Sequence, residues 1–453
     1  MEQIQEYLRQ IGENLSREFL PDAESFVEAH QKAAPLSLRL HPRKAGDIDY
    51  QQAEPVAWNS QGRYLQDRPS FTMDPLFHAG AYYVQEASSM SIEAALNELY
   101  PSERKLNILD LCGAPGGKST LLASFLNGKG VLVCNEVIRS RAQILKENMD
   151  KWGYANVLVS NNDPRDFKKL PGVFDVIVCD APCSGSGMFR KDPKTANHWS
   201  HEAIGHCALR QSRIIEDCWT ALKDGGILIY STCSYSEEEN EQQIKSLIEQ
   251  SECELIFPDA LENIQGVVKT SEGFRFYPHR LKGEGFFISV VRKTSPDRQT
   301  FHSNKRIQFF PLHGASELLI DDPEKFVIWQ GKTGRHIFPA EQAEEMASLA
   351  PTLYLLKAGI DEGETKGDKL IPSHELALSV HIRQNISHFD LNENEALRYL
   401  RKEALPNASG LKGLILLRYK GITLGWGNAL PNRINNLLPK SWRIRKDIDT
   451  VSA

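Results

Sequence analysis

Short apolar runs and longer polar stretches alternate along residues 107–291. A buried parallel strand reads as a continuous apolar run and its crossover helix as a polar, amphipathic stretch, so this alternation predicts an α/β domain with a parallel sheet. We expect strands at 107–112, 131–137, 156–161, 174–179, 226–231 and 286–291. An Asp-Gly-Gly turn at 224–226 is expected before the fifth strand. Ser236 and Glu239 have the spacing of a capping box, which predicts that a helix begins there.

The pattern changes on either side of this region. Residues 1–20 carry apolar side chains at helical spacing among charges, which predicts an amphipathic helix instead of a secretion signal. The polar stretch 293–300 is expected to be a linker, and the acidic, glycine-bearing stretch 359–368 an exposed loop. Beyond it, the runs 411–419 and 421–426 predict two short strands joined by a tight turn.

Length and these breaks together predict several domains. A chain of 453 residues is too long for one ordinary core. We expect domains at residues 1–75, 76–294, 295–368 and 369–453. The second of these contains the whole α/β pattern, and the last is expected to be rich in β-structure.

Composition narrows the class of protein. The chain is 41% hydrophobic and 25% charged, and no apolar stretch approaches the ~20 residues of a membrane-spanning helix, so no membrane contact is expected. None of the eight cysteines forms a Cys-x-x-Cys pair, so we expect no disulfide scaffold, no metal site and a reducing, cytoplasmic setting. The net charge of −6 is uneven, because residues 401–453 carry ten Lys or Arg against three Asp or Glu. A basic end suits either a polyanion partner or a solvated surface.

A glycine-rich loop, 110–120, follows the first expected strand and opens a helix. A phosphate-binding P-loop is excluded because Cys112 stands where its first glycine must be, and Pro115 interrupts the dinucleotide fingerprint. The remaining candidate is the glycine loop of S-adenosylmethionine-dependent methyltransferases. Glu136, at the end of the next strand, is then placed to hold the ribose hydroxyls, and Asp163, after the third, the adenine amino group. The alternative is that both carboxylates only cap the helices that follow them.

Two cysteines follow expected strands, Cys183 in the motif Asp-Ala-Pro-Cys-Ser-Gly-Ser-Gly and Cys233 in Tyr-Ser-Thr-Cys-Ser-Tyr-Ser. Ligands collect at the carboxyl ends of strands in an open α/β sheet, so both thiols are expected in one cleft. Carbon 5 of cytosine accepts a methyl group only after a nucleophile has added to carbon 6, and a thiolate suits that addition. Asp180 can then carry a hydrogen bond to ring nitrogen 3, and a second thiol can assist release. We expect the other six cysteines to be inert apolar side chains: Cys112, Cys134, Cys179, Cys207, Cys218 and Cys253.

The motif at 180–187 with residues 190–193, and the Thr-Cys motif with residues 239–241, resemble the RNA cytosine-5 methyltransferase family. The resemblance implies a Rossmann-like core, S-adenosylmethionine as cofactor, Cys233 as the nucleophile and Cys183 as the residue that helps to release product. DNA cytosine methyltransferases attack with a Pro-Cys thiol instead, and the Thr-Cys motif argues against that branch. The cofactor contacts that the resemblance implies are Cys112, Gly113, Ala114, Pro115, Gly116, Gly117, Lys118, Glu136, Arg141, Asp163 and Asp180.

Residues 80–90 are similar to the segment that leads into the catalytic domain throughout that family, and residues 372–378 and 419–427 resemble the C-terminal region of its branch that modifies small-subunit ribosomal RNA, methyltransferase F. This implies a bacterial enzyme with an N-terminal α+β RNA-binding domain, a PUA-like RNA-binding tail, and 16S ribosomal RNA near the decoding region, or the 30S subunit, as partner. Arg39, His41, Arg43 and Lys44 form a further small basic cluster. The expected RNA contacts are Arg190, Lys191, Arg418, Lys420, Trp426, Arg443 and Arg445.

Two alternatives stay open at this point. The same chemistry can act on transfer RNA, or the chain can be a ribosome assembly factor whose cofactor fold only binds RNA. The intact set of Cys183, Cys233, Asp180 and Lys118 speaks against the second. Nothing in the sequence implies an oligomer.

Overall fold

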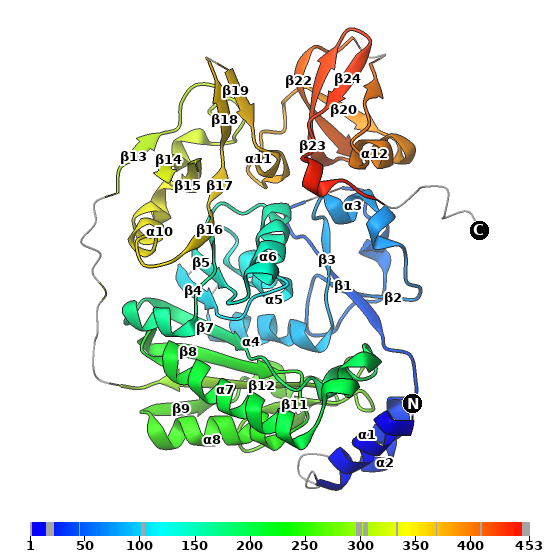
Figure 1. The fold of residues 1–453 in the computed structure, drawn as a ribbon, viewed down its shortest axis with the longest axis vertical. Coiled ribbons are helices and arrows are strands. Elements are labelled where there is room, and N and C mark those ends of the chain that lie inside the picture. Colours follow the sequence, from blue (N-terminus) through cyan, green and yellow to red (C-terminus); the bar gives the residue numbers. More distant parts are fainter. Residues whose placement is uncertain are drawn as a thin grey trace.

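The computed structural model describes residues 2–14, 22–44, 46–100, 105–295, 301, 307–331, 334–367, 369–407 and 410–445. A large mixed sheet forms its centre, with the N-terminal part beside it and the C-terminal part above it in the view of Figure 1. Its strands run in the order β10-β11-β12-β8-β7-β4-β5-β6-β16, and β9 pairs with β12. The bounds are β4 (Leu106–Asp110), β5 (Gly130–Asn135), β6 (Val157–Ser160), β7 (Phe174–Asp180), β8 (Leu222–Thr232), β9 (Cys253–Ile256), β10 (Val268–Lys269), β11 (Phe274–Phe276), β12 (Phe286–Lys293) and β16 (Leu355–Ala358).

The parallel part of this sheet confirms the α/β prediction, and all six predicted strands lie where the sequence places them. β7, β4, β5 and β6 pair in parallel, as do β7 and β8. The sixth predicted strand, β12, pairs with β8 in the antiparallel direction, so the expectation of an all-parallel sheet is wrong there. An apolar run signals that a strand is buried on both faces but does not encode its direction.

The Asp-Gly-Gly segment lies inside a strand and not before it. β8 begins at Leu222 and includes residues 224–226, with Gly225 at φ +74°. The register between β7 and β8 shifts between Phe174 and Val176, so the glycine absorbs a bulge instead of making a turn. The sequence signal for a backbone irregularity was therefore correct, but its type was not.

Apolar cores lie on the two faces of the sheet. Side chains alternate along β4, so that Ile108 joins one core and Leu109 the other. Helices contribute to one core or the other and thereby cover the two faces. The first core takes side chains from α4 (Ser91–Leu99), α5 (Gly117–Leu126) and α6 (Arg139–Trp152), and the second from α7 (His201–Trp219), α8 (Glu241–Gln250) and α10 (Ala343–Leu349).

The N-terminal part begins with the expected amphipathic helix, α1 (Glu2–Asn14), and residues 1 and 15–20 of the predicted range lie outside the described residues. It continues with α2 (Ala23–Ala29), α3 (Pro75–His78) and a sheet of β2 (Gly62–Leu65), β1 (Leu36–Leu40) and β3 (Tyr82–Val84). The expected boundary at 75 differs from the structure, because β3 still pairs with β1.

The basic cluster at residues 39–44 is largely structural. Arg39 is 1% exposed, and its guanidinium donates to Gln85 and Thr120 and stands over the Trp152 ring. Lys44 donates to two main-chain carbonyl oxygens. These cations therefore join the N-terminal part to α5 and α6 and do not form a free RNA-binding patch.

The C-terminal part contains more β-structure than the sequence predicts. One sheet is formed by β13 (Phe309–Pro311), β14 (Phe326–Gly331), β15 (Gly334–Pro339) and β17 (Ile360–Asp361), and β18 (Gly363–Lys366) pairs with β19 (Lys369–Pro372). The stretch 359–368, expected as a loop, thus contains β17 and β18, and residue 368 lies outside the described residues. β16 extends the central sheet by pairing with β6, so residues expected in a separate domain complete the core. Residues 296–300 of the expected linker are also outside the described ones.

The last module confirms the predicted strand pair. β22 (Gly413–Tyr419) and β23 (Ile422–Leu430) form an antiparallel pair, and Gly421 has φ +79° in the turn between them. The other elements of this module are α11 (His374–Leu378), β20 (His388–Leu391), α12 (Glu393–Leu400), β21 (Leu405–Pro406) and β24 (Arg433–Asn436). This module shares one apolar core with the N-terminal sheet, which includes Leu38, Leu76, Leu397 and Leu424. The first and last parts of the chain are therefore packed together. Within the part of the chain that the structure describes, no helix combines the length and apolarity of a membrane span.

A buried ion-pair cluster joins the core to this C-terminal part. Lys357 on β16 is fully buried and pairs with Asp150 of α6, at 3.2 Å, and with Glu375 of α11. Burial lowers the pKa of Lys357 to about 8, although the Asp150 carboxylate opposes that shift. The lysine is therefore the shared cation of two buried carboxylates.

We predict that Lys357→Met lowers the free energy of unfolding by about 3–5 kcal/mol, because it leaves the buried Glu375 carboxylate without its cation and Asp150 with Lys146 alone. Denaturant unfolding measures this, and Lys369→Met, at an exposed position of β19, is the matched control. Equal stability of the two variants would contradict the assignment.

Candidate active site

The two motif cysteines lie side by side at the carboxyl edge of the sheet. Parallel pairing sets Asp180, the last residue of β7, opposite Ser231 of β8. Cys183 follows β7 by three residues and Cys233 follows β8 directly, and their Sγ atoms are 3.3 Å apart. Both side chains are only partly buried. The structure therefore brings the two thiols together at one edge of the sheet, as expected.

Asp180 lies beside the thiols in a paired state. Its Oδ2 is 2.7 Å from Lys118 Nζ of α5, and its Oδ1 accepts a hydrogen bond from Ser231 Oγ at 2.9 Å. Burial lowers the pKa of Lys118, but the carboxylate of Asp180 outweighs it, so the net pKa is raised. About a third of the Asp180 side chain stays exposed, which leaves the carboxylate accessible to a ligand.

Glu239 connects the two cysteine loops, a role that its sequence motif did not suggest. Its carboxylate accepts hydrogen bonds from Ser184 and Ser234, the residues directly after the two cysteines. The predicted capping box is absent, because Ser236 makes no side-chain cap and the helix α8 begins only at Glu241. The Glu239 carboxylate is directed to the loops instead of to the helix terminus, which explains why the spacing was misleading.

The glycine loop leads from β4 into α5. Gly116 has φ +124°, a conformation that side-chain-bearing residues rarely adopt, and a Cβ on Gly113 would lie 2.7 Å from Ser119 Oγ. Arg141 of α6 donates to the Ala114 carbonyl oxygen at 2.8 Å. Arg141 therefore supports the loop from behind, in addition to the cofactor role expected of it.

Asp110 is a residue of this loop that the sequence reasoning did not single out. It is completely buried, accepts a hydrogen bond from Ser119 Oγ at 2.5 Å, and its Oδ1 has no hydrogen-bond partner. Burial raises its pKa to about 7, while the Ser119 hydrogen bond and Lys118 act in the opposite direction. The signal that identifies Asp110 is its unpartnered acceptor atom under the loop. This signal is visible only in the structure.

Two further carboxylates follow the next two strands. Glu136 comes directly after β5, accepts from the Ile138 main-chain N–H at 2.9 Å, and lies 3.4 Å from Arg141. Asp163 comes three residues after β6 and accepts from the Arg165 N–H at 3.1 Å, so the capping alternative describes part of what this side chain does. Both stand at the same sheet edge as the glycine loop.

Three of the expected RNA contacts are engaged inside the protein. Trp426 is 1% exposed and donates to the Ser373 carbonyl oxygen, so it offers no ring face to a base. Arg418 is buried and donates to the carbonyl oxygen of Gln384. Arg190 forms a buried ion pair with Glu284 at 2.7 Å. These expectations were wrong because the partners of these side chains are distant in sequence and only folding brings them close.

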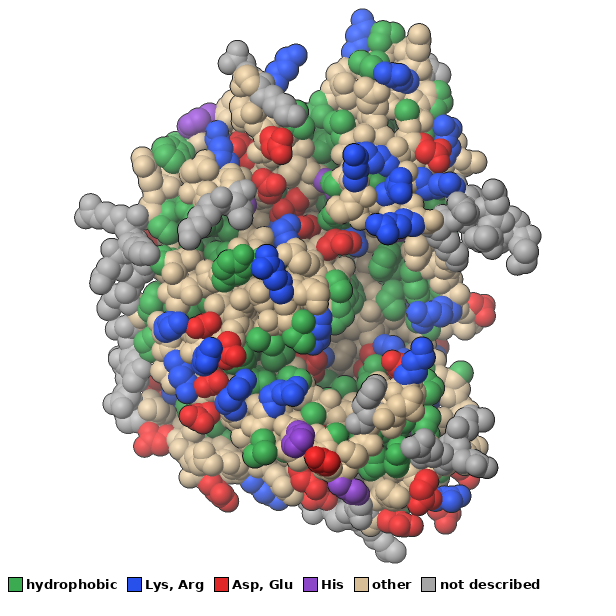
Figure 2. Space-filling view, in the orientation of Figure 1, with side chains coloured by type: hydrophobic (Ala, Val, Ile, Leu, Met, Phe, Trp, Pro, Cys, Tyr) green, Lys and Arg blue, Asp and Glu red, His purple; other side chains and the backbone are tan. Residues whose placement is uncertain are grey.

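The remaining expected RNA contacts are accessible. Lys191, Arg443 and Arg445 are exposed, and Lys420 pairs with Asp49 of the N-terminal part. Figure 2 shows Lys and Arg side chains gathering on the face of the C-terminal part. This surface is therefore the basic face that the uneven charge predicts.

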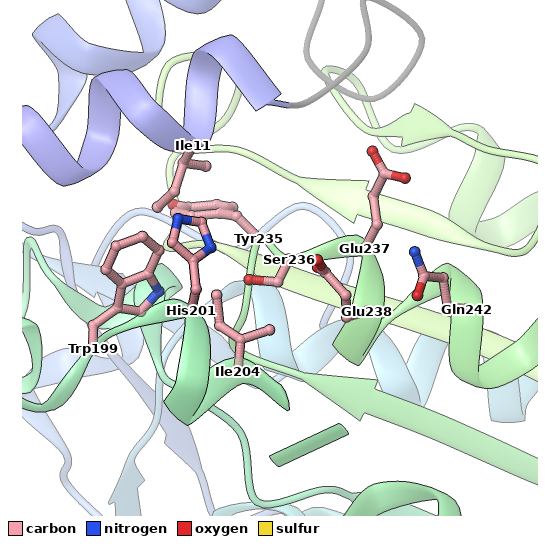
Figure 3. Close-up of a pocket in the computed structure, with 9 residues that line it drawn as sticks. All are labelled: Ile11, Trp199, His201, Ile204, Tyr235, Ser236, Glu237, Glu238 and Gln242. Carbon is pink, nitrogen blue, oxygen red and sulfur yellow. The ribbon is translucent and has the colours of Figure 1, made fainter. Parts of the chain in front are cut away.

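A pocket beside the Thr-Cys loop lies where α1 packs on the core (Figure 3). Ile11 of α1 faces Trp199, Ile204 of α7 and Tyr235, two residues after Cys233. Two acidic side chains, Glu237 and Glu238, line its other side, which does not suit a polyanion. No group of three or more His, Cys, Asp or Glu side chains able to hold a metal ion occurs in the described ranges.

We predict that Arg190→Ala lowers the free energy of unfolding by about 3–5 kcal/mol, because it leaves the buried carboxylate of Glu284 without its cation. Lys191→Ala, at the exposed neighbouring position, should leave stability unchanged and weaken RNA binding. Thermal unfolding and RNA filter binding of both variants measure this. A stable Arg190→Ala protein with weakened RNA binding would contradict this prediction and show that Arg190 binds RNA phosphate.

Three family models match the chain in succession. The N-terminal domain of 16S rRNA methyltransferase RsmF matches residues 5–87, the 16S rRNA methyltransferase RsmB/F model matches residues 96–292, and the methyltransferase RsmF PUA domain matches residues 386–444. The second match contains the glycine loop, both cysteine motifs and Glu239.

Curated relatives cover almost the whole chain. The chain is 32% identical to ribosomal RNA small subunit methyltransferase F of Aliivibrio fischeri over 96% of both chains, and 31% identical to that of Vibrio cholerae over 92% of both. Among solved structures, a methyltransferase homologue from Pyrococcus horikoshii is 28% identical, with a TM-score of 0.51, over 64% of this chain and 98% of its own. The chain belongs to the ribosomal RNA small subunit methyltransferase F family.

Proposed function

We propose that the protein transfers a methyl group from S-adenosylmethionine to carbon 5 of a cytosine in 16S ribosomal RNA. The observation that carries the proposal is the pair of thiols 3.3 Å apart beside the Lys118–Asp180 ion pair. A nucleophilic thiol, a second thiol and an acid–base pair are what addition to a pyrimidine and release from it require. The relatives' names and the match to a PUA domain support RNA as the substrate.

The residues around the glycine loop fit S-adenosylmethionine. A ligand whose ribose hydroxyls and ammonium group donate hydrogen bonds needs acceptors, and Glu136, Asp163 and Asp180 all stand at this edge of the sheet. The loop residues Cys112 to Gly117 present main-chain groups at close range, because glycine at 113 and 116 leaves no Cβ in the way. When bound, the cofactor supplies the methyl group.

The thiols divide the work according to their surroundings. The hydrogen bond to Cys233, burial, and the nearby charges of Cys233, Glu239 and Asp180 all raise the pKa of Cys183. A raised pKa suits Cys183 as the thiol that keeps its proton, and the resemblance of the Thr-Cys motif to the family assigns the addition to carbon 6 to Cys233. The electron pair moves toward ring nitrogen 3, where a hydrogen bond from the Lys118 ammonium, which Asp180 holds in place, stabilises the negative charge.

Release reverses the addition. After methyl transfer the hydrogen on carbon 5 leaves as a proton to bulk water, its bonding pair becomes the carbon 5–carbon 6 double bond, and the carbon 6–sulfur bond breaks, so that Cys233 departs as a thiolate. The Cys183 S–H group, 3.3 Å away, donates to that departing sulfur and stabilises it. Because a paired base cannot present carbon 6 to a thiol, the target nucleotide must be unpaired or flipped out.

Exposed cations are available to hold the neighbouring RNA. Lys191 lies on the chain after the Pro-Cys motif, and Arg443 and Arg445 lie on the C-terminal module. Phosphate contacts by such residues are independent of base sequence and orient the RNA. We infer action on ribosomal RNA or the 30S subunit in the cytoplasm, where the eight free cysteines stay reduced.

We predict that Cys233→Ala abolishes both methylation and any covalent protein–RNA complex, whereas Cys183→Ala accumulates the covalent complex. Wild type and both variants are incubated with labelled S-adenosylmethionine and 30S subunits, naked 16S RNA or transfer RNA, and Cys253→Ala is the control. Methylation by Cys233→Ala would contradict the mechanism. Labelling of transfer RNA alone would contradict the substrate, and 30S maturation that is unaffected by Cys233→Ala would favour an assembly factor.

We predict that Glu136→Gln weakens S-adenosylmethionine binding about 10-fold or more, because hydrogen bonds to a charged acceptor contribute about 1.5–3 kcal/mol. Titration calorimetry without RNA measures this directly. Glu249→Gln, at an exposed position of α8, is the matched control. Unchanged affinity in Glu136→Gln would remove this residue from the cofactor site.

A further inference from the structure

The carboxylate of Glu239 lies between the two cysteine loops and is completely buried. Its Oε1 accepts from the Ser184 main-chain N–H at 2.7 Å, and its Oε2 from Ser184 Oγ at 2.6 Å. Oε2 also accepts from Ser234 Oγ, and Gln211 Nε2 of α7 lies 3.4 Å from Oε1. One side chain therefore holds the residue after Cys183 and the residue after Cys233 at the same time.

The main chain that carries Glu239 is itself anchored to the end of β8. Tyr230 Oη donates to the Glu239 carbonyl oxygen at 2.6 Å. The adjacent Asn240 accepts from Thr232 Oγ1 at 2.5 Å and donates to the Ser234 carbonyl oxygen at 2.9 Å. These bonds fix the position of the carboxylate, and the two loops are hydrogen-bonded to it there.

Charge sets this carboxylate apart from the other buried acids near the site. Glu284 and Glu241 pair with Arg190 and Arg275. Across the described residues, no Lys, Arg or His nitrogen lies within 4.0 Å of the Glu239 carboxylate. A buried charge balanced only by hydrogen-bond donors is costly, and its field acts on the nearest titratable groups. Those groups are the thiols: the charge of Glu239 contributes to raising the pKa of Cys183 and of Cys207.

We propose that Glu239 is a positioning residue of the methyl-transfer site, which fixes the Pro-Cys loop against the Thr-Cys loop and places a buried carboxylate beside the Cys183 loop. The inference rests on the proposed function for its link to catalysis. Hydrogen bonds to Ser184 and Ser234 set the separation of the two sulfur atoms. The negative charge of this carboxylate disfavours a thiolate at Cys183.

Gln211 reinforces the same arrangement. Its Nε2 donates to the Pro182 carbonyl oxygen at 3.0 Å, which holds the residue before Cys183 from the side of α7. The Pro-Cys loop is thus held on both sides of the cysteine, by Gln211 before it and by Glu239 after it. Neither residue touches the reacting sulfur atoms.

The test compares Glu239→Gln with Glu238→Gln, which makes the same substitution at the exposed neighbouring residue. The amide keeps the shape of Glu239 but removes its charge and one acceptor. We expect kcat for RNA methylation to fall about 100-fold, since a displacement of reacting groups by about 1 Å has effects of this size. The dissociation constant for S-adenosylmethionine should stay within about twofold of wild type, because Glu239 is remote from the glycine loop in the hydrogen-bond network.

A second readout needs no RNA substrate. Alkylation of Cys183 by iodoacetamide is followed by site-resolved mass spectrometry across pH. Removing the charge should lower the pH midpoint of Cys183 alkylation by about one unit in Glu239→Gln and leave it unchanged in Glu238→Gln. Loosened packing would lower the thermal stability of the variant. A shifted midpoint in a variant of unchanged thermal stability therefore cannot come from loosened packing.

Two results would overturn the proposal: Glu239→Gln with wild-type kcat, or a Cys183 midpoint equal to that of Glu238→Gln. If Glu239→Gln does not fold, Ser184→Ala and Ser234→Ala replace it, and their effects on kcat must be less than additive because both act through one carboxylate. Additive effects would also overturn it. If wild type methylates no RNA, the proposed function fails, while the alkylation midpoint still decides whether Glu239 controls Cys183.

Discussion

Parallel pairing of β7 with β8 is the constraint on which the site depends. The pairing sets Asp180 opposite Ser231, so the segments that leave the two strands start from adjacent points on one edge. Cys183 and Cys233, 50 residues apart in sequence, are brought to 3.3 Å. A register shift of one residue would turn Asp180 to the other face of the sheet. The bulge near Gly225 absorbs the irregularity at the opposite end of β8, away from the thiols.

Charged side chains lie on different sides of the two thiols. Lys118 pairs with Asp180 beside the two thiols, and Glu239, which has no cation partner among the described residues, lies between the two cysteine loops. The C-terminal half supports the core without contributing to this pair, through β16 at the sheet edge and the Lys357 cluster. The shared apolar core of the N-terminal sheet and the last module joins the expected RNA-binding parts to each other.

Much of this arrangement was predictable from the sequence, for a definite reason. Apolar runs identify buried strands, and Asp180, Cys183 and Cys233 follow such runs, so their common edge follows from α/β topology. Long-range partners were not predictable: Glu284 takes Arg190 out of RNA binding, and Trp426 turns into a core that local composition does not reveal. The direction of β12 and the use of Glu239 by two loops instead of a helix terminus likewise depend on contacts that form only in the folded chain.

The most direct test of the central claim uses RNA that contains 5-fluorocytidine at the target. Fluorine on carbon 5 cannot leave as a proton does, so the covalent intermediate should persist after methyl transfer. Proteolysis and mass spectrometry of the trapped complex then identify the cysteine bound to carbon 6. The account predicts that the peptide containing Cys233 carries the nucleotide, and a nucleotide on the peptide containing Cys183 would contradict it.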